Sequence, residues 1–426
     1  MTPDGEQDGM EIEEGPPGDA PDFDGENAPA LGDGQDEGEG PSEQRVTWLE
    51  LFFDLIFVTA FDQLAKRLGD APTGHNLLVF GLMFAAVWWA WAGNTTFAAR
   101  YGNDSRAYRW GTLVQLFTLG TLTLTLRGDL SDTGMAFGLA YTANRLVLVG
   151  MYLLTLRSHP ESAAFARGQV LGFGGAALFW FASAFLQGGA ELLAWGVALV
   201  IDVLTPILGR DRQRAALPHQ EHLPERVGLL QIIALGGIVT EVVAGSRQQE
   251  LRWFEQAPAL LALVTAVGMW RLYFDQARAL PVLAAHRAGR VGSLLAWLYG
   301  HLPFTLSVVM LAVGFGHGIS DEDGARDAVN RQLVAWPLAG AALTLLFLRC
   351  NVLYVAGRRL LDPSVVAIAV AAAASVSLAF MPLDTLATHA AACAIVLGAA
   401  LVTARDPATH RLGKMEEELG ASGTPV

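Results

Sequence analysis

RVTWLELFFDLIFVTAFDQLAKRL, residues 45–68, is long and apolar enough for a membrane-spanning helix, although it carries three acidic residues. At about 100° per residue, Glu50 and Asp54 fall on one helical stripe together with Thr47. An ionised carboxylate at the centre of a bilayer costs about 2.5–3.5 kcal/mol on insertion scales. We therefore expect this helix to turn its acids towards other protein or a wet cavity, and we take Glu50, Asp54 and Asp62 as candidate functional residues.

The segment before this stretch, residues 1–44, contains 15 of the 42 Asp and Glu residues and no Lys or Arg. Low hydrophobicity with high net charge is typical of chains that cannot bury enough apolar surface to fold, so a disordered acidic tail is predicted there. The rest of the chain is almost neutral, with 28 basic against 27 acidic residues. Its basic residues form no dense patch, which argues against nucleic-acid binding.

Twelve apolar stretches near membrane-spanning length follow from Trp48 onward, separated by short connections rich in Gly, Pro, Asp and Arg. The pattern predicts an all-α polytopic membrane protein with about 12 transmembrane helices. The expected spans are 48–67, 76–98, 109–127, 135–156, 169–187, 190–208, 226–245, 257–279, 291–316, 333–356, 364–381 and 385–403.

The Lys and Arg residues are distributed unevenly over the connections between these spans. The N-terminal segment, the alternate loops on its side and the C-terminal segment together carry 18 of them, against 7 on the opposite side. The positive-inside bias therefore predicts that both termini are cytoplasmic, with residues 406–426 as a short cytoplasmic tail.

An offset of 181 residues aligns the two halves of the chain and places Arg45–Val46 on Arg226–Val227. Twelve spans in two halves of six give both halves the same orientation, so parallel six-helix repeats over residues 45–215 and 220–405 are expected. Such repeats bring the first and seventh helices to equivalent places near the middle of the assembly. Helix one is then expected to face helix seven.

Four stretches of the sequence mark a resemblance to one family of bacterial membrane proteins. They are RVTWLELFFDLIFVTAFDQL (45–64), HLPERVGLLQIIALG (222–236), MWRLYFD (269–275) and YGHLPFTLSVVMLAVG (299–314). Over about residues 45–405 the chain resembles the bacterial low-temperature-requirement A (LtrA) proteins. The resemblance implies a multi-pass protein of the bacterial plasma (inner) membrane. The family name records a requirement for growth in the cold and implies no settled chemistry.

The resemblance also draws attention to an acid on the seventh helix. The LtrA pattern places a Glu directly after the ERxGLLxIIALG run, whereas this sequence has Gly237 there and carries Glu241 one helical turn later. Residues four apart share nearly the same helix face, so Glu241 can present its carboxylate deeper along the same stripe. The alternative is that the family's site is lost in this chain.

His301 lies in the segment Gly300-His301-Leu302-Pro303. A proline inside a helix leaves a carbonyl one turn earlier free to meet a cation or water, which makes His301 a candidate for an ion path. The alternative is a histidine that bonds to a neighbouring helix beside an ordinary membrane kink.

Other charged residues within the predicted spans have a structural explanation. Arg145, Arg271 and Arg349 lie in the interior of predicted spans, away from the span ends, and they are candidates for fixed charge partners. The acids that we consider for these pairs are Asp54, Asp202 and Asp275.

The leading functional hypothesis is a transporter or channel for cations or protons. Its expected path residues are Glu50, Asp54, Asp62, Glu241 and His301. Membrane lipid is the expected partner, a homodimer is compatible with the sequence, and no cofactor is expected. A metal site is not expected either, because His219 and His222 have no Cys or acidic constellation beside them in the sequence.

Two alternatives from other classes stay open. A membrane-embedded enzyme acting on lipid-linked substrates would use Glu50 and His301 as base and acid, but the sequence contains no GxSxG, Walker, HExxH or Cys-His pattern. A non-transporting sensor or assembly factor would use the acidic tail to hold a partner, with the buried charges purely structural.

Overall fold

The computed structural model describes residues 46–421 except 71, 129, 247–255 and 322–326. The predicted acidic tail, Arg45 and residues 422–426 lie outside the described residues. Within the described part the chain is all-helical, as expected. Its α-helices are α1 (Trp48–Asp70), α2 (Gly74–Tyr101), α3 (Arg106–Thr125), α4 (Leu130–Ser158), α5 (Ala163–Ser183), α6 (Gly189–Leu208), α7 (His222–Ser246), α8 (Ala257–Gln276), α9 (Leu280–Ala288), α10 (Val291–Ser320), α11 (Asp327–Val355), α12 (Pro363–Leu378), α13 (Thr385–Arg405) and α14 (Pro407–Ala421), with short 3-10 helices at Pro160–Ser162 and Arg210–Ala215.

Each of the twelve predicted spans coincides with one of these helices. By length and composition, eight segments of the described chain are long and apolar enough to cross a membrane. These are α2, α4, α6, α7, the continuous segment of α8 and α9, α10, α11 and α13. Of the other predicted spans, α1 carries charged residues and α12 has only 16 residues. The structure therefore supports a multi-pass membrane protein.

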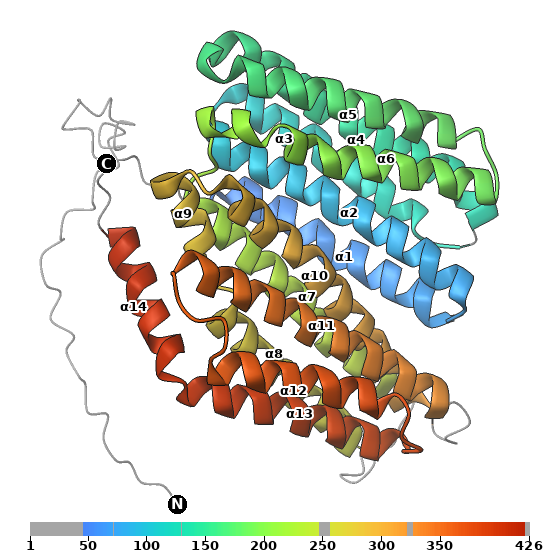
Figure 1. Cartoon of the computed structure of the whole chain (residues 1–426). Helices are drawn as coiled ribbons and strands as arrows, with labels where there is room; N and C mark the ends of the chain where they lie inside the picture. The colour runs from blue at the N-terminus through green and yellow to red at the C-terminus, as the bar shows by residue number, and fades with distance from the viewer. Residues whose placement is uncertain (1–45, 71, 129, 247–255, 322–326, 422–426) are drawn as a thin grey trace, which may run out of the picture. The chain divides into compact units, whose positions relative to one another are not determined.

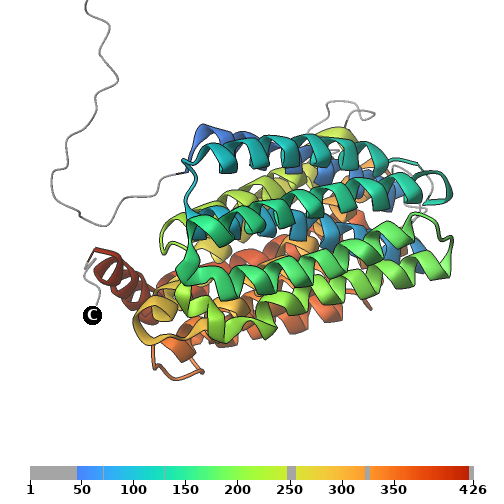
Figure 2. The ribbon, with the colours of Figure 1, turned by 90° about the horizontal axis from the view of Figure 1, so that it is seen from above.

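The long helices run side by side, and the same order of neighbours recurs in both halves of the chain (Figures 1 and 2). In the first half α3 packs on α4, α4 on α5, α5 on α6, and α6 on α2. In the second half α10 packs on α11, α11 on α12, α12 on α13, and α13 on α8. The halves meet where α1 packs against α7 and α10. The expectation that helix one faces helix seven is confirmed.

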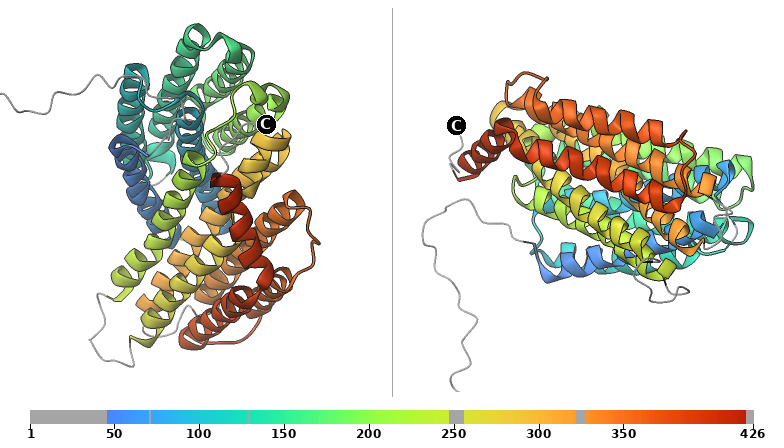
Figure 3. Two further views of the ribbon diagram at one scale, coloured as in Figure 1. Left: turned by 90° about the vertical axis from the view of Figure 1, so that its left-hand side faces the viewer. Right: turned by 90° about the horizontal axis from the view of Figure 1, so that it is seen from below.

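Two helices occupy segments where the sequence predicted a loop and a tail. The loop after the eighth span contains α9, and the segment 406–426 contains α14, which lies at one end of the helix bundle (Figure 3). Leu412, Met415 and Leu419 give α14 a short apolar face, which packs against Leu280 and Leu283 of α9. Both helices are too short for a search by span length, so neither α9 nor the helix α14 within the predicted C-terminal tail was expected from the sequence.

α10 and α11 approach closely at a glycine. A Cβ atom built on Gly314 would lie 2.6 Å from the carbonyl carbon of Leu333 and 2.9 Å from the amide nitrogen of Val334. Both contacts are to backbone, which cannot rotate away. Small residues at such positions are what allows membrane helices to pack closely.

We expect Gly314→Ala to destabilise the fold by about 1–3 kcal/mol, because the helices must separate to admit one methyl group. The measurement is the melting temperature of the detergent-purified protein. Gly292→Ala, in the same helix, is the matched control, since nothing lies within 4 Å of a Cβ at that position. Equal melting temperatures for the two variants would show that the α10–α11 contact is loose.

Candidate functional site

Glu50 first has a local role at the start of α1. The amide and the hydroxyl of Thr47 donate hydrogen bonds to Oε2 of Glu50, at 2.9 and 3.0 Å, and the amide of Glu50 lies 3.4 Å from Oγ1 of Thr47. This reciprocal arrangement is a capping box, in which a Thr and a Glu three residues later satisfy free amides at a helix start. The backbone thus fixes the position of the Glu50 carboxylate.

The same carboxylate is also the meeting point of three other segments. Its Oε1 accepts a hydrogen bond from Nη1 of Arg226 at 2.9 Å and lies 3.0 Å from Nε2 of His222, both on α7. Asn103, between α2 and α3, donates to Oε2 at 2.8 Å, and the hydroxyl of Tyr108 on α3 donates to Oε1 at 3.2 Å. Glu50, His222 and Arg226 are fully buried. A completely desolvated carboxylate is therefore surrounded by donors.

Asp54, one turn further along α1, forms a two-bond pair with the same arginine. Nε and Nη2 of Arg226 donate to its two carboxylate oxygens at 2.8 and 2.7 Å, and the indole nitrogen of Trp91 on α2 donates to Oδ1 at 2.9 Å. Bidentate guanidinium–carboxylate pairs are among the strongest and most directional hydrogen-bonded contacts in proteins. The partner of Asp54 is thus Arg226, at the start of the seventh helix, and none of the three arginines that the sequence offered.

The charges of this cluster do not balance while His222 is neutral. Glu50 and Asp54 contribute two negative charges and Arg226 one positive charge, so the group is negative when His222 is neutral and balanced when His222 is protonated. Burial of an uncompensated charge is costly. The cluster therefore favours the presence of one additional positive charge.

Two further acids, one on α1 and one on α7, line a small cavity further along the same pair of helices. Asp62 and Glu241 both line it, together with Phe61 of α1 and Val309 of α10. Lys66 pairs with Asp62 at 2.7 Å. No described residue donates a hydrogen bond to the Glu241 carboxylate. Glu50, Asp54 and Asp62, by contrast, all accept hydrogen bonds from described residues.

An aromatic column separates the two acidic clusters. Phe53, Phe57 and Phe61 succeed one another along α1, with ring centroids 5.6 and 6.2 Å apart, and Phe61 stacks on Phe84 of α2 at 5.3 Å. All four rings are buried. Along α1, the interface with neighbouring helices thus has an acidic cluster at each end and a buried aromatic stretch between them.

His301 lies in a different environment, on α10 beside α8. Its Nδ1 lies 2.7 Å from the carbonyl oxygen of Trp297, and its ring contacts those of Trp297 and Tyr273. One turn later, the hydroxyl of Thr305 donates to Oε1 of Gln231 on α7 at 3.0 Å. His301 and Glu50 therefore have separate sets of contacts.

Comparison with known proteins identifies the family of this chain. A family model described as bacterial low temperature requirement A protein (LtrA) matches residues 45–401, most of the chain. The chain belongs to the LtrA family. It is also similar to an uncharacterized protein of Rhizobium meliloti (strain 1021), with 25% identity over 289 residues, which cover 65% of this chain and 70% of the relative. No solved structure matches the chain significantly.

The LtrA match includes both acidic clusters, but the partners of the acids had to come from the structure. His222 and Arg226 lie four residues apart in the HLPER motif, so they share one face of α7. That spacing, together with the TWLE capping signature around Glu50, is the signal that could have identified them. Asn103, Tyr108 and Trp91 carry no comparable signal.

The structure gives each remaining charged candidate a partner of its own. Arg145 and Asp202 are buried side by side, with Nε and Oδ2 3.4 Å apart. Arg271 pairs with Asp275 one turn later at 2.7 Å, and the arginine side chain is 48% exposed. Arg349 pairs with Asp362 at 2.6 Å and with Asp406 at 3.6 Å. Among the described residues, no group of three or more His, Cys, Asp and Glu is placed to hold a metal ion.

Proposed function

We propose that this member of the LtrA family is a transporter or channel that passes protons or cations along the interface of α1 and α7. The chain is an integral membrane protein with several apolar helices. The observation that carries the proposal is the position of four acids, Glu50, Asp54, Asp62 and Glu241, in two clusters on one pair of neighbouring helices. Ionisable residues inside a membrane most often mark ion or proton pathways.

The first cluster supplies a site that holds one extra positive charge. Its excess of acid is balanced by protonation of His222 or by a cation beside Glu50. A proton carried by the Glu50–His222 pair is therefore the simplest form of the proposal.

The second cluster supplies an acceptor at the other end of the aromatic column. Asp62 is engaged by Lys66, whereas Glu241 faces the cavity without a hydrogen-bond donor among the described residues. A carboxylate in that position takes up a proton or contacts a cation at little structural cost. We assign Glu241 as the second binding residue of the path. The sequence also placed His301 on the path. Its contacts are with residues of α8 and α10, so we propose no direct role for it in the path along α1 and α7.

The proposal includes a topology. Twelve membrane spans would comprise α1–α8 and α10–α13, arranged as two parallel repeats over residues 45–215 and 220–405. Four helix pairings that recur at equivalent places in the two halves support the repeat. We propose that the protein lies in the bacterial inner membrane with both termini cytoplasmic, as the distribution of Lys and Arg indicates.

The test is a flux assay in proteoliposomes with imposed gradients of protons, sodium or potassium. We expect wild-type flux for one of these ions and a loss of at least about tenfold in Glu241→Gln and in Glu50→Gln, because each substitution removes a titratable charge and keeps the shape of the side chain. Glu50→Gln should fold, since Asp54 and Arg226 still form a neutral pair.

Asp275→Asn is the matched control for that assay. It neutralises an acid on α8 whose partner, Arg271, is half-exposed, so we expect unchanged flux. No flux of any of the three ions, or equal flux in Glu241→Gln and in the wild type, would contradict the proposal.

A further inference from the structure

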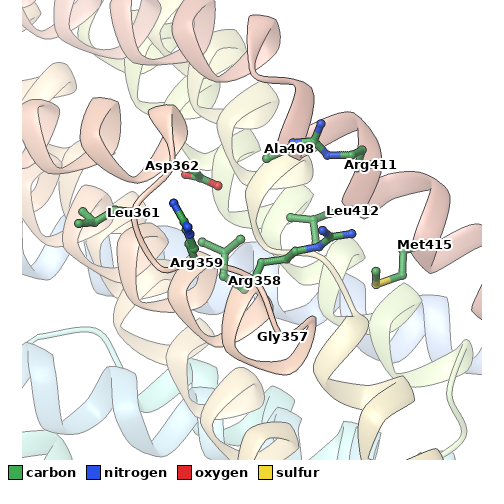
Figure 4. A pocket seen from close by; sticks show the side chains of 10 residues that line it. Gly357, Arg358, Arg359, Leu361, Asp362, Ala408, Arg411, Leu412 and Met415 are labelled. Carbon is green, nitrogen blue, oxygen red and sulfur yellow. The ribbon is translucent and has the colours of Figure 1, made fainter.

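A cavity of about 370 Å³ lies between the connection from α11 to α12 and the helix α14 (Figure 4). Three arginines line it, Arg358 and Arg359 from the connection and Arg411 from α14. Its volume is within the range of small-molecule sites, which is about 300–1,000 Å³. The cavity is remote in sequence from α1 and lies outside the path proposed above.

The backbone at this site is built to present the arginines. α11 ends at Val355, and Gly357, two residues later, has a φ of 62° in the left-handed region. The amide of Arg358 returns to the carbonyl of Leu353 at 2.9 Å. This is the usual glycine-terminated end of a helix, and it turns the chain sharply away from the helix axis. The two residues after the glycine are consequently Arg358 and Arg359, at the mouth of the cavity.

Hydrogen bonds of Asp406 hold the start of α14 on the other side of the cavity. Oδ2 of Asp406 accepts hydrogen bonds from the hydroxyl and the amide of Ser364 at 2.6 and 3.2 Å, and its Oδ1 accepts one from the amide of Ala408 at 2.9 Å. Burial by itself would raise the pKa of Asp406, but these hydrogen bonds, helped by Arg349, hold that pKa below its ordinary value. Asp406 is therefore ionised near neutral pH and ties the start of α14 to α12.

Among the described residues, none neutralises the positive charge of the three arginines that line the cavity. Asp362, the acid on its wall, is already paired with Arg349 at 2.6 Å and also caps α12 by accepting from the amide of Val365 at 2.8 Å. None of the three lining arginines forms an ion pair with a described residue. Three guanidinium groups with planar donors and no ion-pair partner in the described part of the chain are well suited to an oxyanion.

The remaining lining is apolar and adjoins exposed leucines. Leu353, Leu412 and Met415 form the apolar part of the wall, and Leu361, at the edge, is 79% exposed together with Leu360 at 51%. Exposed leucines next to arginines at the end of membrane helices are typical of the zone where lipid head groups meet hydrocarbon. The site thus combines an anion-binding part with an apolar part.

We propose that this cavity binds a phosphate group, held by Arg358, Arg359 and Arg411. The phosphate belongs either to the head group of an anionic phospholipid, whose acyl chains would lie along Leu360 and Leu361, or to a soluble phosphate. Both sources present the same tetrahedral oxyanion to the three guanidinium groups. Binding would link α14 to the α11–α12 connection.

The experiment measures binding to the full-length, delipidated protein in detergent by native mass spectrometry and by the shift in melting temperature. The probes are dioleoyl phosphatidylglycerol, dioleoyl phosphatidylcholine and inorganic phosphate. The variant is Arg358→Gln/Arg359→Gln/Arg411→Gln, and we expect it to bind the effective probe at least about tenfold more weakly than the wild type. All three arginines are exposed residues, so the variant should fold.

The matched control is Arg210→Gln/Arg212→Gln/Arg214→Gln, which removes the same charge from three exposed arginines between α6 and α7. That connection is at the same end of the bundle, because His286 of α9 contacts the carbonyl of Pro218 at 2.8 Å and Arg290 contacts the carbonyl of Val355 at 3.4 Å. We expect the control to bind like the wild type.

Each outcome decides the proposal. Binding of phosphatidylglycerol alone identifies a lipid head group, and stabilisation by inorganic phosphate alone identifies a soluble phosphate. Equal losses of binding in the variant and the control would show only bulk attraction of anions to a basic surface. Equal binding by the variant and the wild type would contradict the proposed site. If the triple variant fails to fold, Arg411→Gln alone replaces it, with the same expectations and a smaller loss.

Discussion

Replacing Arg226 with glutamine should remove most of the folded protein, because it strands two buried carboxylates at once. Arg226 is the partner of both Glu50 and Asp54, and all three side chains are at most 3% exposed. Removal of one partner from a buried ion pair costs about 3–5 kcal/mol, a large part of the roughly 5–15 kcal/mol by which a protein is stable. The yield of monodisperse protein and its melting temperature in detergent measure the effect.

Two further variants make this expectation specific. Arg271→Gln removes a half-exposed arginine from a pair on one helix turn and should change the stability by less than about 0.5 kcal/mol. Arg226→Gln combined with Asp54→Asn removes both members of the bidentate pair and should recover part of the lost yield. A melting temperature of Arg226→Gln equal to that of the wild type would mean that the carboxylates reach water or bind a proton without it.

Arg145→Gln is expected to have the second large effect on stability, because it leaves Asp202 unpaired in the interior of the first half. Both side chains are fully buried, and the guanidinium group also contacts the hydroxyl of Tyr141 and lies 5.5 Å from the ring centre of Phe173. We expect a loss of about 3–5 kcal/mol, read from the melting temperature.

The control for this pair is the double variant Arg145→Gln/Asp202→Asn. It removes both charges and keeps two polar side chains of similar size, so it should be more stable than Arg145→Gln alone. If the double variant is no more stable than the single one, the contribution of Arg145 comes from its packing on the aromatic rings and not from its charge.

The two pairs show how far the sequence could predict the site. The stripe of Glu50 and Asp54 was predictable from helical periodicity, because the environment of a membrane helix penalises acids on the lipid face. Their partner was not predictable, since Arg226 is 172 residues away from Asp54 and reaches it only through the packing of α7 on α1. The arginines that the sequence offers as fixed partners lie in the interior of predicted spans. Arg226, which pairs with the acids, lies at the start of the predicted span 226–245.

The fold shows a similar division between local and long-range information. Stretches of 20 apolar residues predicted the positions of the long helices, because length and hydropathy are local properties. The helices α9 and α14 were missed, since an amphipathic helix of 9 or 15 residues has no such signature and is stabilised by the surface that it covers. Asp62 was grouped with the other acids of α1, but the structure directs it to a separate cavity with Glu241.

The separation between Glu50 and Arg226 has a consequence for biosynthesis. The two residues are 176 positions apart, and a ribosome that adds about 5–20 residues per second needs roughly 10–35 s to cover that distance. During this time α1 has emerged, and the carboxylates of Glu50 and Asp54 lack the guanidinium group of Arg226 that pairs with both of them. The ion-paired cluster of α1 is therefore completed only after the second half of the chain has begun to emerge.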